Sequence, residues 1–294
     1  MMRTWLTLII SFIASNLSAQ TSYTGFIDKF PIDLVTNIYS DGVANAIYAY
    51  QKFDEPIIIN GRLEKSVLTL LEKNGKGKNV SMFTFENFDV KSNTIVGTWA
   101  NLKTLKEFKV ILNKDFDVAY GEDVEWNNRE IIQPVSLKDQ YFKLLISKNK
   151  DDFYARVTGI KIIEKKKDSL IQKIDMDCQL LGLDNIFVGD FNFDGLPDFS
   201  VFESSYAGPN TSSLYFLYNP ATKKYFNSGF SGVSLAFDNK KKTISEHNQC
   251  CAGSQHTTAI YKVVNNKMVL IEQHCYKWDE EKEELVERKM SECQ

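Results

Sequence analysis

Short apolar stretches recur along most of the chain, and within them apolar and polar residues alternate. This period of two is typical of β-strands that bury one face. Glycine, asparagine and aspartate separate the stretches at 41–42, 74–77 and 91–93, where these residues favour hairpin loops. The pattern predicts an antiparallel meander or small barrel over residues 20–120. Its expected strands are 46–50, 57–61, 67–72, 82–86, 94–99 and 108–112.

The alternation fades over residues 121–140, where polar residues follow Trp126 and Pro134 interrupts the chain. We interpret this segment as a linker to a second, mainly β domain over residues 141–294. That domain contains a hairpin across Asn265 and Asn266, a pair that suits positive φ angles. Its expected strands are 141–147, 154–164, 170–174, 186–188, 199–203, 214–218, 225–227, 233–238, 243–246, 259–264 and 268–272.

One loop of the second domain has the spacing of a calcium site, D-x-N-x-D-G-x-x-D over residues 190–198. Hard oxygen ligands at alternate positions, with glycine at the sixth, let a short loop surround Ca²⁺. The twelfth position is Val201 instead of glutamate, and apolar flanks predict strands on both sides, as in propeller-type calcium loops. The alternative is an acidic turn without an ion. The expected ligands are side-chain oxygens of Asp190, Asn192 and Asp194, the backbone carbonyl of Leu196, and Asp198 directly or through water.

The first 19 residues read as a signal peptide with a positive start, a short apolar run and a small-residue cleavage site after Ala19. We therefore expect a periplasmic or secreted protein. The apolar run is too short to span a membrane as a helix, so no membrane insertion is expected. The formal net charge of −3 is too mild to argue for a nucleic-acid partner.

All five cysteines lie in the C-terminal half, and export permits disulfides. The first expected pair is Cys275 with Cys293, across a final hairpin around 279–284; a short helix over 279–288 is the alternative. The second expected pair joins Cys178 to Cys250 or Cys251. For the adjacent Cys250 and Cys251 we favour one bonded cysteine beside a buried thiol. The odd count leaves one cysteine unpaired or intermolecular.

A zinc site made by histidines with Cys250, Cys251 or Cys275 is an alternative. Three histidines, His247, His256 and His274, surround them in sequence. Their spacing fits no standard zinc pattern, and disulfides compete for the same sulfur atoms in an exported protein. Calcium remains the favoured cofactor.

The segment 206–210 follows the strand that succeeds the calcium loop. Bound Ca²⁺ would stiffen the base from which it projects. We interpret Tyr206, Gly208 and Asn210 as a partner-binding loop, with Tyr206 and Asn210 as hydrogen-bonding tips. The alternative is a simple connecting turn in which Tyr206 covers the core.

Segments 189–195, 203–210, 215–220 and 223–226 resemble bacterial periplasmic calcium-binding, lysozyme-inhibitor-like immunity proteins. The resemblance implies a pseudo-propeller of short antiparallel blades with one calcium loop. It also implies a partner, a secreted peptidoglycan hydrolase whose lysozyme-like active site is blocked. The N-terminal half is similar to small β domains on exported proteins of Bacteroidetes-like bacteria.

No catalytic constellation emerges from the sequence, so an enzyme is not expected. The segment 229–233 misses the G-x-S-x-G pattern because its fifth residue is Val233. The carboxylates Asp198 and Glu203 are more simply explained as calcium ligands or their neighbours. Three functional classes stay open: an exported inhibitor or immunity protein, a calcium-binding envelope scaffold without an enzyme target, and an unrecognised hydrolase.

Overall fold

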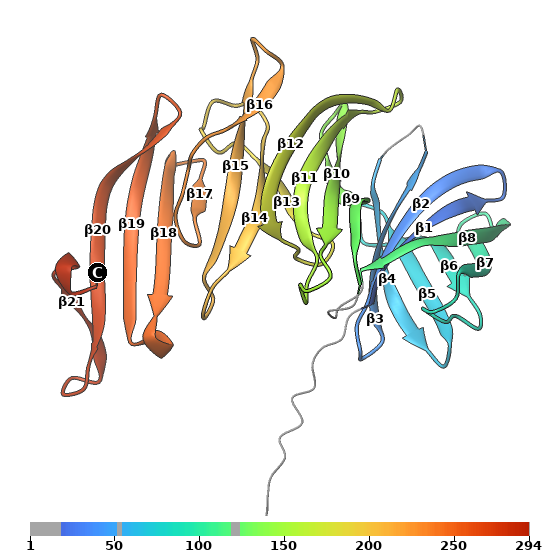
Figure 1. The fold of residues 1–294 in the computed structure, drawn as a ribbon, viewed down its shortest axis with the longest axis horizontal. Coiled ribbons are helices and arrows are strands. Elements are labelled where there is room, and N and C mark those ends of the chain that lie inside the picture. The colour runs from blue at the N-terminus through green and yellow to red at the C-terminus, as the bar shows by residue number, and fades with distance from the viewer. Residues whose placement is uncertain (1–18, 52–54, 119–123, 294) are drawn as a thin grey trace, which may run out of the picture.

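The computed structural model describes residues 19–51, 55–118 and 124–293. Nearly all regular structure in these ranges is antiparallel β-sheet (Figure 1), which confirms the predicted mainly β fold. The described residues contain no helix long and apolar enough to cross a membrane. The predicted signal peptide lies outside the described residues except for Ala19, which begins the first strand.

The first eight strands close into a barrel in which each strand pairs with the next and β1 pairs with β8. This confirms the predicted meander or small barrel. Alternate side chains point inward and form an apolar core that includes Tyr23, Leu34 and Phe83, each 0% exposed. The strands are β1 (Ala19–Ile27), β2 (Phe30–Ile38), β3 (Val43–Tyr50), β4 (Ile57–Glu64), β5 (Val67–Lys73), β6 (Asn79–Phe85), β7 (Thr94–Asn101) and β8 (Glu107–Val118).

A four-stranded antiparallel sheet, here the first sheet, follows the barrel. The predicted linker over 121–140 is wrong for Trp126–Ser136, because these residues form β9 and pair with β10. Pro134 is tolerated because β9 is an edge strand of its sheet, where a missing backbone N–H need not break a ladder. The strands are β9 (Trp126–Ser136), β10 (Gln140–Lys148), β11 (Arg156–Glu164) and β12 (Ser169–Gln179).

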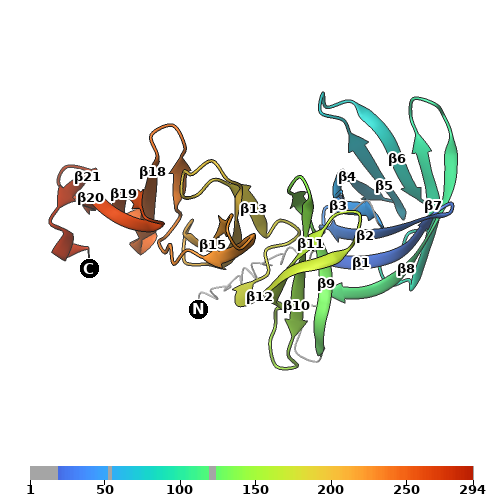
Figure 2. The ribbon, with the colours of Figure 1, turned by 90° about the horizontal axis from the view of Figure 1, so that it is seen from above.

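Two further antiparallel sheets, here the middle and last sheets, complete the chain. Their strands pair in sequence order, as in propeller blades, and the sheets follow one another in a row away from the barrel (Figures 1 and 2). The middle sheet comprises β13 (Ile186–Gly189), β14 (Asp198–Ser205), β15 (Thr211–Asn219) and β16 (Lys224–Asn227). The last sheet comprises β17 (Ala236–Asp238), β18 (Thr243–Cys250), β19 (Gln255–Val264), β20 (Lys267–Asp279) and β21 (Glu284–Arg288).

Two predicted hairpins of the last sheet are confirmed. Asn265 and Asn266 have φ angles of 51° and 58° and join β19 to β20. Strands β20 and β21 form the final hairpin, so the helical alternative for this segment is wrong. Two short 3-10 turns flank these strands, η1 (Cys251–Gly253) and η2 (Met290–Glu292).

The buried apolar residues form separate cores that position the loops between the sheets. One core runs from the outside of the barrel, at Val35 and Phe116, through Phe142 of the first sheet to Phe199 of the middle sheet. A smaller core joins the middle and last sheets and includes Leu217. The barrel interior is a third. The loop 190–197 borders the smaller core.

Candidate metal loop and the neighbouring turns

The predicted calcium loop connects β13 to β14, and its two ends pair directly, Gly189 with Asp198. The loop is therefore flanked by strands, as the apolar flanks predicted. Gly195, at the sixth position, has a φ of +85°, a left-handed conformation that favours glycine. The required sharp turn is present in the described structure.

Side-chain oxygens of the loop are fixed by backbone N–H groups of the same loop. Asp190 accepts from the N–H of Asp194 at 3.0 Å through Oδ1 and from the N–H of Gly195 at 2.9 Å through Oδ2. Oδ1 of Asn192 accepts from the same Asp194 N–H at 3.2 Å. Oδ1 of Asp194 accepts from the N–H of Leu196 at 2.8 Å. The oxygens at the first and third positions therefore converge on one backbone group.

Asp198 differs from the other acidic residues because its side chain is 0% exposed. Its oxygens accept the N–H of Phe191 at 2.9 Å and the N–H of Tyr218 at 2.8 Å. Burial raises the pKa of this carboxyl group to about 6, and the two N–H bonds lower it only in part. Asp194 raises the pKa further through its negative charge. The site thus destabilises a buried negative charge, which a cation would offset.

The donor set fits a hard cation. Within the described ranges, none of Asp190, Asp194 and Asp198 makes a salt bridge to lysine or arginine. A carboxylate oxygen that accepts one N–H retains a second lone pair for a metal. In the described part of the chain, no group of three or more His, Cys, Asp or Glu side chains has converged to metal-binding distance. Binding would therefore draw in side chains that backbone N–H groups now hold.

The loop also connects two sheets. Asn192 donates from Nδ2 to Oδ1 of Asn266 at 2.9 Å, in the β19–β20 turn. Lys242 donates to the carbonyl oxygen of Phe193 at 3.4 Å. The Phe191 ring contacts Phe237 of the last sheet, with ring centroids 4.8 Å apart. No local pattern in the sequence predicts these contacts, because they join residues 46 to 74 positions apart in the chain.

The predicted partner-binding loop is only partly exposed. Tyr206 is 51% exposed and its hydroxyl lies 3.1 Å from Oγ of Ser212. Gly208 is exposed and has a φ of +72°. The interpretation of Asn210 as an exposed tip is wrong, because only 7% of this residue is exposed.

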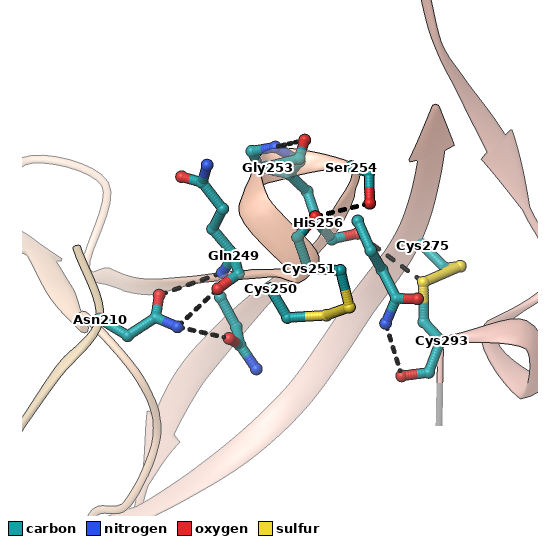
Figure 3. Close-up of a disulfide and its surroundings, with 11 residues drawn as sticks. Asn210, Gln249, Cys250, Cys251, Gly253, Ser254, His256, Cys275 and Cys293 are labelled. Carbon is teal, nitrogen blue, oxygen red and sulfur yellow. Dashed lines mark hydrogen bonds between the residues drawn. A yellow bond between two sulfur atoms is a disulfide. The ribbon is translucent and has the colours of Figure 1, made fainter. Parts of the chain in front are cut away.

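Asn210 instead bridges the middle and last sheets (Figure 3). Its Nδ2 donates to Oδ1 of Asn248 at 3.0 Å and to the carbonyl oxygen of Gln249 at 2.7 Å. Its Oδ1 accepts the N–H of Gln249 at 3.1 Å. A short amide can satisfy both backbone groups of one residue in this way, which explains its burial.

The cysteines form two disulfides. Cys275 bonds Cys293, which confirms the first predicted pair. Cys250 bonds the adjacent Cys251, and Cys178 is a buried free thiol. The second predicted pair is therefore wrong, as is the interpretation of Cys250 and Cys251 as one bonded cysteine beside a buried thiol. Cys178 lies on β12 of the first sheet, whereas Cys250 ends β18 of the last sheet.

The imidazole rings of the three histidines contact groups other than these sulfur atoms. His256 Nδ1 lies 3.3 Å from His247 Nε2, and His256 Nε2 lies 3.0 Å from the carbonyl oxygen of Gly253. His274 pairs with Glu287 at 2.6 Å. The hydrogen bond to Glu287 raises the pKa of His274. The zinc alternative loses its three candidate cysteine ligands, since Cys250, Cys251 and Cys275 are in disulfides.

A charged cleft that the sequence did not indicate lies between the barrel and the first sheet. Two adjoining cavities, of about 250 and 370 Å³, share Asp33, Glu130 and Lys143. The ammonium of Lys143 lies 3.7 Å from Asp33 and 3.8 Å from Glu130. Lys161 also pairs with Glu130. Because these charges are paired with one another, the cleft acts as an ion-pair network at the junction.

Comparisons with known proteins add little to this geometry. No family model and no curated protein matches this chain. Among solved structures, a type IV secretion system related protein from Xanthomonas is 11% identical with a TM-score of 0.27, covering 92% of this chain and 99% of that one. The WD40 domain of SCAP from fission yeast is 9% identical with a TM-score of 0.31, and the match covers 87% of this chain and 65% of that one. The β-propeller domain of the Trilobed protease from Pyrococcus furiosus is 10% identical with a TM-score of 0.24, and the match covers 91% of this chain and 84% of that one.

Proposed function

We propose that this chain is an exported, calcium-stabilised binding protein that blocks a lysozyme-like peptidoglycan hydrolase. The main support for calcium binding is the oxygen-rich loop 190–198. Its carboxylates have no cationic partner among the described residues, and its last member, Asp198, is fully buried. The resemblance of segments 189–226 to lysozyme-inhibitor-like proteins supports the choice of partner.

In this proposal the ion has a structural role. When bound, Ca²⁺ would be held by Asp190, Asn192, Asp194, Asp198 and the carbonyl of Leu196, and would offset most of the negative charge of the carboxylates. Asp198 begins β14, and Ser205 ends it. Tyr206 follows directly, so the exposed turn is about 25 Å from the metal along one strand. Calcium would therefore stiffen the base of the turn and would affect partner binding only indirectly.

The first experiment is a thermal melt of the mature protein in EDTA and in millimolar CaCl₂ or MgCl₂. We expect calcium to raise Tm selectively, because a ligand at 100 times its Kd stabilises the folded state by about 2.7 kcal/mol. The double variant Asp190→Ala, Asp194→Ala should lose this shift. Asp238→Ala is the matched control, since Asp238 also caps a turn, at Lys240 and Lys241, but outside the loop. An unchanged Tm of the unmodified protein in calcium would refute the metal site.

The second experiment measures lysis of a peptidoglycan suspension by lysozyme-type hydrolases with increasing amounts of the protein. We expect inhibition, and expect Tyr206→Ala to weaken it. Tyr39→Ala is the control, because Tyr39 is also surface-exposed, at 37%, but belongs to a barrel turn. Calcium-dependent stability without inhibition of any such hydrolase would favour the envelope scaffold. Glycan turnover by the protein itself would favour a hydrolase.

A further inference from the structure

The turn between β18 and β19 contains two adjacent cysteines bonded to each other (Figure 3). Cys250 ends β18, and Cys251 begins the short η1 turn. Cys251 and Ala252 have φ angles of 58° and 54°, in the left-handed region that residues with a Cβ atom avoid. The turn therefore needs specific interactions to keep this conformation.

Several contacts hold the turn. Ser254 donates to the carbonyl oxygen of Cys251 through its hydroxyl at 2.7 Å and through its N–H at 3.1 Å. The disulfide itself links neighbouring residues, so it closes almost no loop. Stabilisation of a fold by a disulfide grows with the length of the loop that it closes. This bond therefore contributes little to global stability, and its main effect is on the conformation of the turn.

The turn is physically joined to the predicted partner-binding loop. Gln249, directly before Cys250, is held through its backbone N–H and carbonyl by Asn210. A cavity of about 120 Å³ is lined by both segments, from Ala207 to Pro209 on one side and from Gln249 to Gly253 on the other. A change in the conformation of residues 250–253 would therefore reach residues 206–210 through one side chain.

We propose that the Cys250–Cys251 bond is a thiol–disulfide exchange site for a dithiol reductant, and that its reduction loosens the 206–210 loop. Cys251 is exposed, so an external thiolate can reach its sulfur. That thiolate attacks Sγ of Cys251, the bond to Sγ of Cys250 breaks, and Cys250 leaves as a thiolate that takes up a proton. The second thiol of the reagent then attacks the mixed disulfide, releases Cys251 as a thiol, and leaves the reagent oxidised.

The other cysteines provide internal contrasts. Cys275 is 0% exposed and its partner Cys293 is half-buried, and their bond ties β20 to the C-terminal η2 turn. Cys178 is also 0% exposed. Buried sulfur atoms are poorly accessible to an attacking thiolate, so the two disulfides should differ in their response to a reductant.

The test uses the full mature chain in calcium, treated with graded dithiothreitol under native conditions and then alkylated. Mass spectrometry of the peptides should show Cys250 and Cys251 labelled at reductant concentrations about tenfold lower than Cys275 and Cys293, because access limits exchange. Hydrogen exchange of residues 206–211 and 249–256 should rise in the selectively reduced protein. Earlier labelling of Cys275, simultaneous labelling of all four, or free thiols at Cys250 and Cys251 before reduction would overturn the proposal.

Variants test separately the Cys250–Cys251 disulfide and its effect on hydrogen exchange of residues 206–211. The double variant Cys250→Ser, Cys251→Ser should show the faster exchange of 206–211 without reductant and no further response to it. Cys178→Ser should respond like the unmodified protein. Asn210→Ala should raise exchange of 206–211 in the oxidised protein while leaving the order of cysteine labelling unchanged. Unchanged exchange of 206–211 on reduction would overturn the coupling.

Any effect on hydrolase inhibition rests on the proposed function, whereas the exchange site does not. Selective labelling with no inhibition at any stage would contradict the proposed function alone. Inhibition that is insensitive to reduction, together with unchanged exchange of 206–211, would contradict the coupling alone.

Discussion

The carboxyl group of Asp198 and the thiol of Cys178 are both fully buried, and burial shifts both pKa values upward. Their surroundings differ in what they offer the charged form. Asp198 receives two backbone N–H bonds, which favour its ionised state. Cys178 lies near the negative charges of Glu203 and Asp177, which disfavour a thiolate. Backbone N–H groups therefore offset part of the cost of charging Asp198, whereas nearby carboxylates add to the cost of forming a thiolate at Cys178.

Cys178 should be chemically inert in the folded protein. Burial, aided by Glu203, raises the pKa of its thiol to about 12. At pH 8 only about one molecule in ten thousand would carry the reactive thiolate, and the sulfur is also inaccessible. We expect no alkylation by iodoacetamide at pH 8 in native buffer and complete alkylation in guanidinium chloride. Labelling of Cys178 in the native protein, measured by mass spectrometry, would contradict this.

At the level of the elements, the closed barrel depends on close contact between neighbouring strands. Gly61 of β4 pairs with Leu70 of β5. A Cβ atom at Gly61 would overlap the carbonyl oxygen of Thr69 on that strand. The absence of a side chain therefore lets β4 and β5 approach each other in the barrel wall.

Gly61→Ala should destabilise the protein by about 1–3 kcal/mol, because the added methyl group forces two paired strands apart. Gly75→Ala is the matched control, since a Cβ atom there meets no other atom within 4 Å. Its effect should stay within about 0.5 kcal/mol. Urea unfolding followed by circular dichroism measures both variants. Equal stability of the two would show that the barrel wall can adjust.

Some strands and hairpins could be predicted from the sequence, and others could not. Hairpins marked by local turn chemistry, such as the one across Asn265 and Asn266, were predicted correctly. Strand β1 was not among the expected strands, because its residues Gln20, Thr21 and Ser22 are polar and yet nearly fully buried. Thr21 hydrogen-bonds the side chain of Asp117 on β8, a partner 96 residues away. A pattern of apolar residues cannot reveal a strand whose buried positions are polar.

In the candidate site, too, contacts between residues close in sequence were predictable and contacts between distant residues were not. The oxygens of the loop 190–198 lie close in sequence, so their spacing alone suggested calcium. The bridge from Asn210 to Gln249 spans 39 residues, and the contact of Asn192 with Asn266 spans 74. Those contacts depend on how the middle and last sheets pack, which the sequence did not specify. The exposed-tip interpretation of Asn210 failed for this reason.

At the level of the whole molecule, two cores outside the barrel interior join successive parts of the chain. The larger core runs without interruption from Val35 of the barrel through Phe142 of the first sheet to Phe199 of the middle sheet. The last sheet contributes to a different core, around Phe230 and Ile244. Phe191 and Phe193 of the candidate calcium loop pack on this smaller core. The candidate calcium loop is thus coupled to the last sheet as well as to the middle sheet that contains its flanking strands.

This arrangement of the cores predicts how damage to each core should spread. Phe142→Ala should cost about 3–5 kcal/mol and raise hydrogen exchange in the barrel and the middle sheet together, because one continuous core holds both. Phe230→Ala should raise exchange in the last sheet and the loop 190–197 and leave the barrel protected. Calcium should oppose both changes, since Asp198 of its site begins β14 of the middle sheet and Phe191 and Phe193 of the loop pack on the smaller core. Hydrogen exchange of the barrel that rises equally in both variants would mean that the chain opens as one unit, with the smaller core unable to unfold alone.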